Sequence, residues 1–247
     1  MSDGGKGAAG GHTVDLREKG GHRDGAQQTS DRRLFVQFLA FGDCEEPAVV
    51  GRALEAAGLT AAVYADVHDP RGIGVVVLDE SVDSLVSGLR EVFLKPPLAS
   101  LRLKPEHGLL GRTYGSGFEP NLEDFLLERP RRIVLGEGAR WAIWYPLRRL
   151  GTFASLPPEE QGGILREHGR IGHRFGDAGF VQDIRLACFG LDRSDNDFIL
   201  GLIGRELHPL SACVQAMRAT RQTSQYMQQM GPFFIGRTLW QSPVSRP

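Results

Sequence analysis

WYPLRR occupies residues 144–149, LPPEEQGGILREHGRIGHRFG occupies residues 156–176, and VQDIRLACFG occupies residues 181–190. The first and last stretches are rich in apolar and aromatic residues, as strands are, whereas the middle one carries apolar residues at helical spacing. Ser155 precedes a pair of prolines and a pair of glutamates, an order typical of a helix start because these residues suit the positive helix end. We therefore expect a strand, then a helix over about Pro157–Phe175, and then a second strand.

One histidine shares the apolar side of the expected helix. Ile164, His168, Ile171 and Phe175 fall at i, i+4, i+7 and i+11, which is one stripe of a 3.6-residue period. Such a histidine can be a core residue whose hydrogen bond is satisfied inside the protein. It can also present a neutral imidazole to an iron from the wall of a helix.

The N-terminal half carries its patterns in the order β-α-β-β-α-β, which is the ferredoxin-like order. The expected elements are strands at 34–41, 60–67, 72–79 and 100–104, with helices at 45–58 and 81–93.

The C-terminal half repeats that order of elements. The expected elements are strand at 131–135 with 140–146, helix at 157–175, strands at 181–191 and 197–203, helix at 210–220, and a last strand at 232–239. Two such units whose sheets come together would form a mostly antiparallel β-barrel flanked by helices. The sequence therefore predicts an α+β fold of two ferredoxin-like repeats, a dimeric α/β barrel within one chain.

Composition divides the chain into four parts. Residues 1–31 are rich in Gly, Ser, Gln and charge, so we expect a disordered tail. Residues 32–104 form the N-terminal half, and residues 105–129, which include several glycines, form a linker. Residues 130–247 form the C-terminal half, which holds the candidate site.

Charge and apolar content limit the class of partner. The 247 residues are 41% hydrophobic with a formal net charge of −1, which argues against nucleic acid as the main partner. No apolar run approaches the length of a membrane span. Cys44, Cys188 and Cys213 lack metal-type spacing, and their odd number suits a reducing cytoplasm.

Four arginines flank the strand that precedes the helix. They are Arg131, Arg132, Arg148 and Arg149. Guanidinium groups bind carboxylates in a bidentate geometry, so this set suits a ligand with several carboxylates. Most basic runs are instead solvated surface, and that interpretation stays open.

Four blocks of this sequence, in order and spacing, resemble the chlorite dismutase family, which includes the coproheme decarboxylases. They are WYPLRR at 144–149, LPPEEQGGILREHGRIGHRFG at 156–176, IRLACFGL with DNDFILGLIG within 184–204, and AMRATRQTSQYMQQMGPFFIGR at 216–237. The resemblance covers roughly residues 130–240. It implies the barrel described above, usually assembled as a ring-shaped homopentamer, with an iron porphyrin as cofactor.

The resemblance assigns roles to two residues. His168 matches the family's proximal histidine, which binds the haem iron. Tyr145 matches the tyrosine of the Tyr-Pro motif, which in coproheme decarboxylases carries a radical and takes a hydrogen from a propionate. Without the resemblance, Tyr145 is interpreted as a structural residue whose hydroxyl lies at the rim of a strand end.

The resemblance also assigns propionate anchors. Arg149 matches a position that is lysine in well-known members, and Arg131 matches the other cationic position, although a slip of one residue would make it Arg132. Coproheme carries four propionates against two in haem b, so several arginines favour coproheme.

The distal side of the iron separates the family's activities. Chlorite dismutases place an arginine there, on the strand after the proximal helix, whereas coproheme decarboxylases often have glutamine. The matching position falls near Val181–Asp183, with Gln182 and Asp183 as polar candidates. Arg185 shares a strand face with Asp183, so a gap of two residues would restore an arginine.

These residues support one favoured function and three alternatives. The favoured function is peroxide-dependent decarboxylation of coproheme III to haem b, with His168 as iron ligand and Tyr145 as radical residue. The first alternative is a chlorite dismutase or haem peroxidase on the same scaffold. The others are a non-catalytic haem-binding protein and a structural oligomer without a cofactor.

Overall fold

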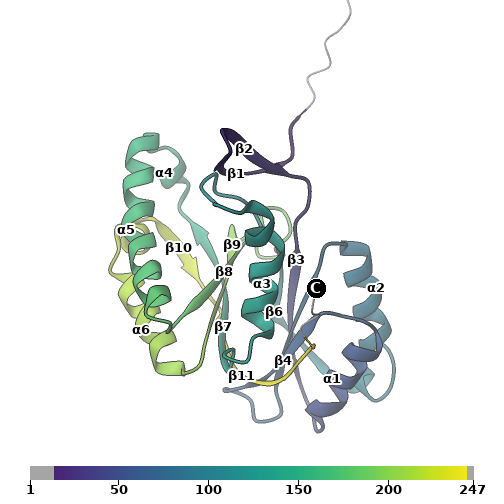
Figure 1. Cartoon of the computed structure of the whole chain (residues 1–247). Coiled ribbons are helices and arrows are strands. Elements are labelled where there is room, and N and C mark those ends of the chain that lie inside the picture. The colour runs from purple at the N-terminus through teal and green to yellow at the C-terminus, as the bar shows by residue number, and fades with distance from the viewer. Residues whose placement is uncertain (1–13, 244–247) are drawn as a thin grey trace, which may run out of the picture.

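The computed structural model describes residues 14–243 and places two similar halves side by side in one antiparallel barrel (Figure 1). The N-terminal half consists of β3 (Phe35–Gly42), α1 (Pro47–Ala56), β4 (Ala61–Asp66), β5 (Ile73–Asp79), α2 (Val82–Phe93) and β6 (Arg102–Arg112). The C-terminal half consists of β7 (Trp141–Arg149), α5 (Pro158–Asp177), β8 (Gln182–Ala187), β9 (Phe198–Gly204), α6 (Leu207–Arg218) and β11 (Phe234–Gln241).

Within each half, the last strand pairs with the first, the first with the third, and the third with the second. Both units therefore have the ferredoxin-like strand order, and the prediction of an α+β fold built from two such repeats is confirmed. The last strand of each half joins the second strand of the other half, through β11–β4 and β6–β8. These two junctions close the sheet into a barrel.

The two junctions differ in extent. Five residues of β11, from Gly236 to Gln241, pair with β4, whereas β6 meets β8 at the single pair Arg112–Ala187. The barrel is therefore closed firmly on one side and by a short seam on the other.

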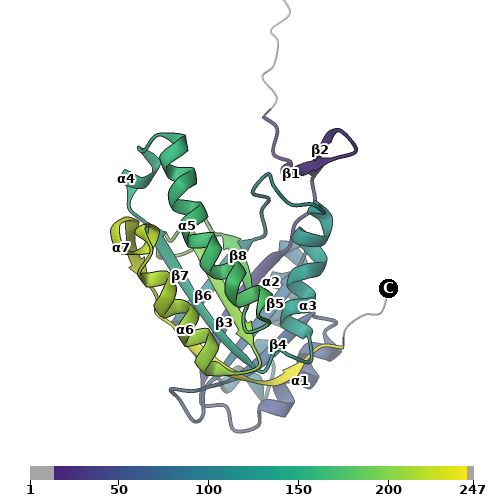
Figure 2. The same ribbon diagram turned by 60° about the vertical axis from the view of Figure 1, so that its left-hand side comes forward.

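Three apolar clusters fill the molecule. One lies inside the barrel, where the π-helical turn η2 (Asp124–Glu128) and α3 (Arg129–Leu135) add Leu126 and Val134. A second lies between the N-terminal strands and α1 with α2, and a third between the C-terminal strands and α5 with α6. We call the second and third the N-layer and the C-layer. Figure 2 shows α5 and α6 lying across the C-terminal strands.

Part of the expected N-terminal tail is ordered, so that prediction is wrong for residues 18–30. They form the hairpin β1 (Glu18–Arg23) and β2 (Ala26–Ser30). Its backbone is tied to the segment that follows β6, with Gly21 N–H donating to Glu119 O at 3.0 Å and Gly117 N–H donating to Lys19 O at 3.0 Å. These backbone hydrogen bonds order a segment whose composition offers little apolar burial. Residues 1–13 of the expected tail lie outside the described residues.

Two other expectations are corrected by the local geometry. Residues 131–135 belong to helix α3, not a strand, since Pro130 stands in the first turn where it suits a helix. Strand β6 runs to Arg112 and crosses the expected boundary at residue 104. Its register against β3 shifts between Lys104 and Leu109, which interrupts the alternation that a sequence pattern relies on.

The main helix of the C-terminal half begins later than its expected cap. Its N-cap is Pro157, without a side-chain hydrogen bond, so Ser155 does not cap it. Short elements that the sequence patterns missed are η1 (Leu98–Ser100), α4 (Gly151–Ala154), α7 (Arg221–Tyr226) and β10 (Met227–Met230). None of the helices in residues 14–243 is long and apolar enough to cross a membrane.

Candidate functional site

Alternation along β7 divides its side chains between the barrel interior and the C-layer. Ala142 and Trp144 belong to the interior cluster, whereas Ile143, Tyr145 and Leu147 belong to the C-layer. This is the division that period two predicts. Tyr145 therefore faces α5 and α6.

Tyr145 is a buried phenol, with 3% of its surface exposed. Its ring stacks on Phe233 with centroids 4.4 Å apart. Burial raises the pKa of Tyr145, because a phenolate is poorly solvated there, and the neighbouring Cys213 acts in the same direction. No residue in the described part of the chain hydrogen-bonds to its hydroxyl, which is therefore free to meet a ligand.

His168 reaches the same layer from α5. Its Nδ1 lies 3.0 Å from Thr220 Oγ1, and its Nε2 has no protein partner among residues 14–243. Burial lowers the pKa of His168, and Arg185 and Arg149 lower it further by repelling a proton. These effects favour the neutral form of the imidazole, which is hydrogen-bonded at one nitrogen and open at the other.

Arg149, at the end of β7, is held by aromatic rings and not by an acid. Its guanidinium lies 4.4 Å from the Phe198 ring centroid and 4.9 Å from that of Phe153. Its backbone N–H donates to Asp197 Oδ2 at 2.8 Å, but the described residues give its guanidinium no ion pair. Burial lowers the pKa of Arg149. A half-buried cation of this kind is a ready partner for a carboxylate.

Two arginines meet one aspartate on β8. Asp183 Oδ1 lies 3.0 Å from Arg129 Nη2, and Asp183 Oδ2 lies 3.2 Å from Arg185 Nε. Ile184 between them points into the barrel, so Asp183 and Arg185 point to the C-layer. Arg185 pairs with Leu200, which pairs with Tyr145. Arg185 therefore stands in the same row of the sheet as Tyr145, two strands away.

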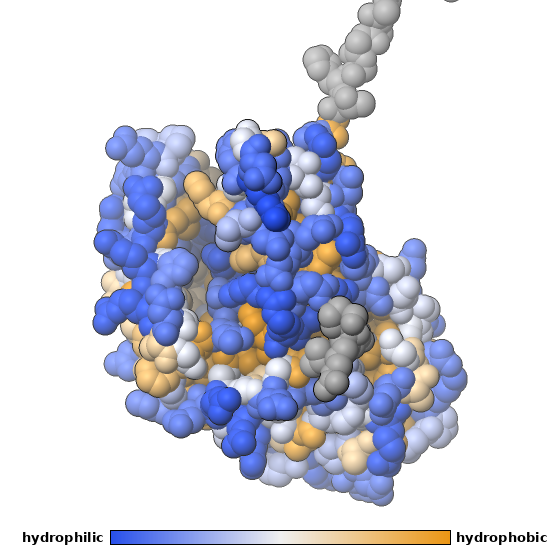
Figure 3. Space-filling model, in the orientation of Figure 1, coloured by the Kyte–Doolittle hydropathy of each residue, from blue (hydrophilic) through white to orange (hydrophobic). Residues whose placement is uncertain are grey.

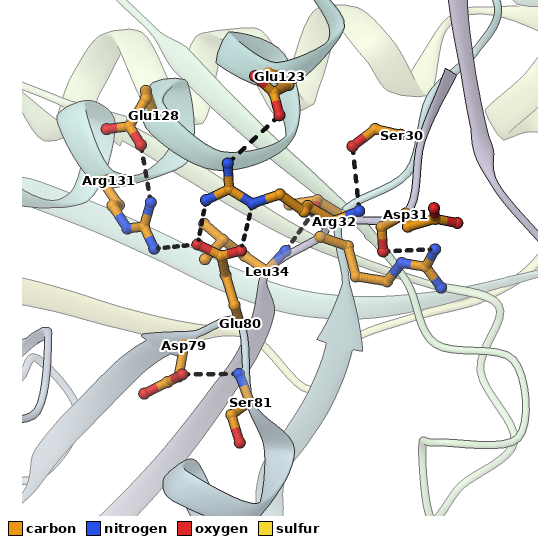
Figure 4. Close-up of polar contacts among 12 residues, drawn as sticks. Ser30, Asp31, Arg32, Leu34, Asp79, Glu80, Ser81, Glu123, Glu128 and Arg131 are labelled. Atoms are coloured by element: carbon orange, nitrogen blue, oxygen red, sulfur yellow. Dashed lines mark hydrogen bonds and ion pairs between the residues drawn. The ribbon is translucent and has the colours of Figure 1, made fainter.

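The structure places four of the expected site residues elsewhere. Arg131 binds Glu128 Oε1 at 2.9 Å and Glu80 Oε1 at 3.5 Å, and Figure 4 shows Arg32 reaching the same Glu80 carboxylate. The partner of Arg132 is Asp124, at 2.6 Å. These bonds fix Arg131 and Arg132 in surface ion pairs.

Gln182 and Arg148 also point away from the C-layer. Gln182 lines a separate cavity of about 130 Å³ together with Arg132 and Arg205. Arg148 pairs with Asp195. The reason is alternation, since each is one residue out of step with a neighbour, Asp183 or Arg149, that does face the layer.

Sequence patterns missed three residues that the fold brings to this layer. Arg129 lies two positions before the expected Arg131 and reaches Asp183 from the start of α3. Thr220 meets His168 from the turn between α6 and α7. Tyr114 lies after β6, with its ring centroid 5.9 Å from that of Phe198, the ring under Arg149. Only the arginine run near residue 130 gave a signal for any of them.

The rest of the lining is apolar and in large part only half-buried. Met217, Met227 and Met230 belong to it, and α5 itself buries only Ile164. Five glycines lie in α5, at positions 162, 163, 169, 172 and 176. Figure 3 shows the surface hollowed between α5 and the centre of the molecule, with hydrophobic residues along the hollow. A pocket of about 260 Å³ is lined in part by Arg218 and by Met227 and Met230, two methionines of this layer.

A comparison with protein-family models decides the family. The model described as "Chlorite dismutase" matches residues 75–239, which is more than half of the chain. The chain belongs to the chlorite dismutase family. The match covers all of the C-terminal half up to β11, and so it contains the whole C-layer on the strands and helices.

Solved structures with this chlorite dismutase fold include two that illustrate the likeness. One is a heme-binding protein from Thermus thermophilus, 18% identical, with a TM-score of 0.66 over 84% of this chain and 91% of that one. Another is a chlorite dismutase from Candidatus Nitrospira defluvii in complex with imidazole, 16% identical, with a TM-score of 0.64 over 87% and 93% of the two chains. Among curated protein sequences, none matches this chain. At these identities the structural likeness concerns the fold.

Proposed function

We propose that this protein is a haem enzyme that converts coproheme III to haem b by peroxide-dependent oxidative decarboxylation. The observation that carries the proposal is the meeting of three incomplete groups in the C-layer. Tyr145 has a hydroxyl without a protein partner among the described residues, His168 has an open Nε2, and Arg149 has a guanidinium without an acid. Membership of the chlorite dismutase family supports an iron porphyrin as the ligand that completes all three.

The residues of the layer fit such a ligand. A neutral imidazole is the form that binds iron, and burial favours this form by lowering the pKa of His168. Arg149 would bind one propionate, and the methionine and phenylalanine side chains would pack against the flat ring. When bound, the iron would supply the reaction with hydrogen peroxide.

Tyr145 would mediate hydrogen transfer. Because its pKa is raised by burial, it keeps its proton at neutral pH and loses proton and electron together when oxidised. The oxidised side chain then takes a hydrogen atom from the propionate carbon next to the ring, and carbon dioxide leaves. For each group the balance is R–CH₂CH₂–COOH + H₂O₂ → R–CH=CH₂ + CO₂ + 2 H₂O. Two rounds on coproheme III give haem b.

The charges around the layer favour the substrate with more carboxylates. Arg129 and Arg185 share Asp183, which leaves one net positive charge on that side. Arg149 adds another, and Arg218 at the neighbouring pocket has no ion pair among the described residues. Four propionates make use of this distribution better than two.

A second candidate function rests on Arg185. Its place in the same row of the sheet as Tyr145 supports chlorite dismutation or a haem peroxidase activity, for which the family resemblance expects an arginine on this strand. A non-catalytic haem-binding protein is the third candidate, supported by the similar fold of the Thermus thermophilus protein that is described as heme-binding.

One experiment separates these functions. The full chain is loaded with ferric coproheme III, hydrogen peroxide is added in steps, and the porphyrins are identified by mass spectrometry. Successive loss of two carboxyl groups supports the decarboxylase. Tight binding without any mass change, together with oxygen release from chlorite, favours chlorite dismutation. Binding without either reaction favours a haem carrier, and no Soret band with any iron porphyrin contradicts the proposal altogether.

The proposal extends to the oligomeric state and the cellular compartment of the protein. The family resemblance suggests a ring-shaped homopentamer, which sedimentation of the purified protein would test. Cys44, Cys188 and Cys213 are all free and buried, which agrees with a cytoplasmic protein.

A further inference from the structure

We propose that Thr220 is the positioning residue of His168, because its hydroxyl oxygen accepts the Nδ1–H proton and so reserves Nε2 for the iron. The choice of tautomer stands on the protein's own geometry. Its use in holding iron rests on the proposed function.

The Thr220 hydroxyl has only one proton to give, and its contacts show where that proton goes. Thr220 Oγ1 lies 2.7 Å from Met217 O. Two oxygens at that distance need a proton between them, and a carbonyl oxygen has none to donate. Thr220 therefore donates to Met217, and its lone pairs remain for other donors.

His168 Nδ1 lies 3.0 Å from this oxygen, so it must be the donor. A neutral imidazole carries one N–H, and with that proton on Nδ1 the lone pair is on Nε2. The other nearby hydroxyl, Thr223 Oγ1, lies 3.5 Å from Thr220 Oγ1 and is a poor competitor for the threonine proton. The structure thus selects the tautomer that is the less common one for an isolated histidine side chain in water.

Thr220 is itself held in place. It is 2% exposed, and its backbone N–H donates to Met217 O at 3.1 Å. Ser224 donates to Thr220 O through its N–H at 2.9 Å and through its hydroxyl at 2.8 Å. The turn between α6 and α7 is therefore a fixed support against which the imidazole is oriented.

Polar contacts tie α5 to the same turn. Arg221 N–H donates to Glu167 Oε1 at 3.3 Å, next to His168 in the sequence, and Arg221 Nη2 lies 2.9 Å from Glu160 Oε1. A ligand nitrogen whose ring is oriented from behind is a stronger base and a better-placed ligand than a free one. Thr220 acts on the iron through His168 and does not touch the reacting atoms.

The first test uses the protein without any porphyrin. Long-range ¹H–¹⁵N spectra of full-length protein with ¹⁵N-labelled histidine report which ring nitrogen of His168 carries the proton. We expect Nδ1–H in the wild type, in Thr220→Ser and in the matched control Thr223→Val, and a shift to Nε2–H in Thr220→Val. An Nε2–H tautomer in the wild type, or an unchanged Nδ1–H tautomer in Thr220→Val, would overturn the inference whatever the protein binds.

The second test loads the same variants with ferrous haem b. In Thr220→Val we expect a lower iron–histidine stretching frequency by resonance Raman and a loss of affinity of roughly 10–100-fold, the usual scale for removing a group that orients a metal ligand. Thr220→Ser should restore both, and circular dichroism shows whether Thr220→Val is folded. Haem binding through His168 with the same frequency in all variants contradicts the role of Thr220 alone. No haem binding by the wild type contradicts the proposed function and leaves the tautomer result standing.

Discussion

The two halves of the molecule share one topology but fill their helix-covered layers differently. The N-layer has fourteen buried residues, all Val, Leu, Ile, Ala, Phe or Cys. The C-layer has seven, and Tyr145 is among them. Helix α1 buries Val50, Gly51 and Leu54 in ten residues, whereas α5 buries only Ile164 in twenty. The same scaffold thus serves stability in one half and leaves room for a ligand in the other.

The two layers differ in the chemistry of their side chains, although their strands and helices are arranged alike. In the N-layer the buried side chains are all apolar and pack against one another, so the layer presents no polar group that a ligand would bind. In the C-layer an imidazole, a phenol and a guanidinium each lack a partner on one side among the described residues. Such groups are costly unless a ligand completes them.

The largest expected effect comes from His168→Ala. It should weaken the binding of ferric coproheme III on the order of a thousandfold or more, about 4 kcal/mol, because no other described residue offers an imidazole in this layer. Titration followed by the Soret band measures it. The thermal midpoint should stay close to that of the wild type, since His168 is only half-buried. Retained tight binding would mean that another residue holds the iron.

Tyr145→Phe should separate binding from chemistry. The phenyl ring keeps the stacking on Phe233, so affinity should change less than about threefold, while decarboxylation should slow by about a thousandfold. Tyr114→Phe is the matched control, because Tyr114 is the other tyrosine near Arg149. Mass spectrometry of the products in single turnovers measures both rates. Vinyl formation by Tyr145→Phe at the wild-type rate would exclude the radical role.

Shortening an apolar side chain should lower the free energy of unfolding more in the N-layer than in the C-layer. Leu54→Ala removes a side chain with 0% exposure and should lower the free energy of unfolding by about 3 kcal/mol. Ile171→Ala, on the half-buried face of α5, should lower it by about 1 kcal/mol or less. Urea unfolding of the two variants measures the difference. Equal losses would show that the two layers are packed alike.

Acidification should affect the C-layer through His168. Its folded pKa lies below the usual value of about 6.5, so the unfolded chain takes up the proton first. Stability from this group is therefore complete above about pH 6.5 and falls as the pH drops below it. Affinity for iron porphyrin should fall in the same direction, because the proton competes for Nε2. Titrations from about pH 8 to about pH 4 bracket the usual histidine pKa and test this, and His168→Asn should lose the dependence.

The last comparison uses one glycine from each half, and its two expected effects have opposite signs. A Cβ at Gly51 of α1 would lie 2.6 Å from the Trp240 ring, so Gly51→Ala should destabilise the protein by about 1–3 kcal/mol. A Cβ at Gly169 of α5 would meet nothing within 4 Å, so Gly169→Ala should stabilise it by about 0.5–1 kcal/mol through helix propensity. Thermal unfolding of both variants decides the sign. Destabilisation by Gly169→Ala would mean that the space beside Gly169 of α5 is filled, contrary to this structure.

Much of the fold follows from periodicity, because strands and helices that bury one face repeat every two or 3.6 residues. That logic predicted both β-α-β-β-α-β series, and the same alternation explains the division of β7 between Trp144 and Tyr145. It failed where other forces act. The 18–30 hairpin is held by backbone hydrogen bonds to a distant segment, and β6 continues through a register shift that includes Pro105 and Gly108.

Residues of the candidate site could be predicted only where the sequence pattern also gave the direction of the side chain. Helical spacing put His168 on the apolar side of its helix, and alternation put Asp183 and Arg185 on one face of their strand. Tyr145 was assigned from the family resemblance. Arg131 and Arg132 were assigned to a strand, but the segment is helix α3. Because of the helical geometry, the arginine that reaches the layer is Arg129. Thr220 lies in a turn 52 residues after His168. No sequence pattern predicts which threonine hydrogen-bonds to a given histidine.

The unequal junctions of the barrel have a mechanical consequence. A closed barrel resists deformation through its strand pairing, and the seam between β6 and β8 consists of the single pair Arg112–Ala187. Strand β8 also carries Asp183 and Arg185, so the weakest line of the barrel runs along a strand of the candidate site. We expect amide protons along β8 near this seam to exchange with solvent before those of β4 and β11. Local opening of this barrel is then concentrated in the strand whose Asp183 and Arg185 border the C-layer.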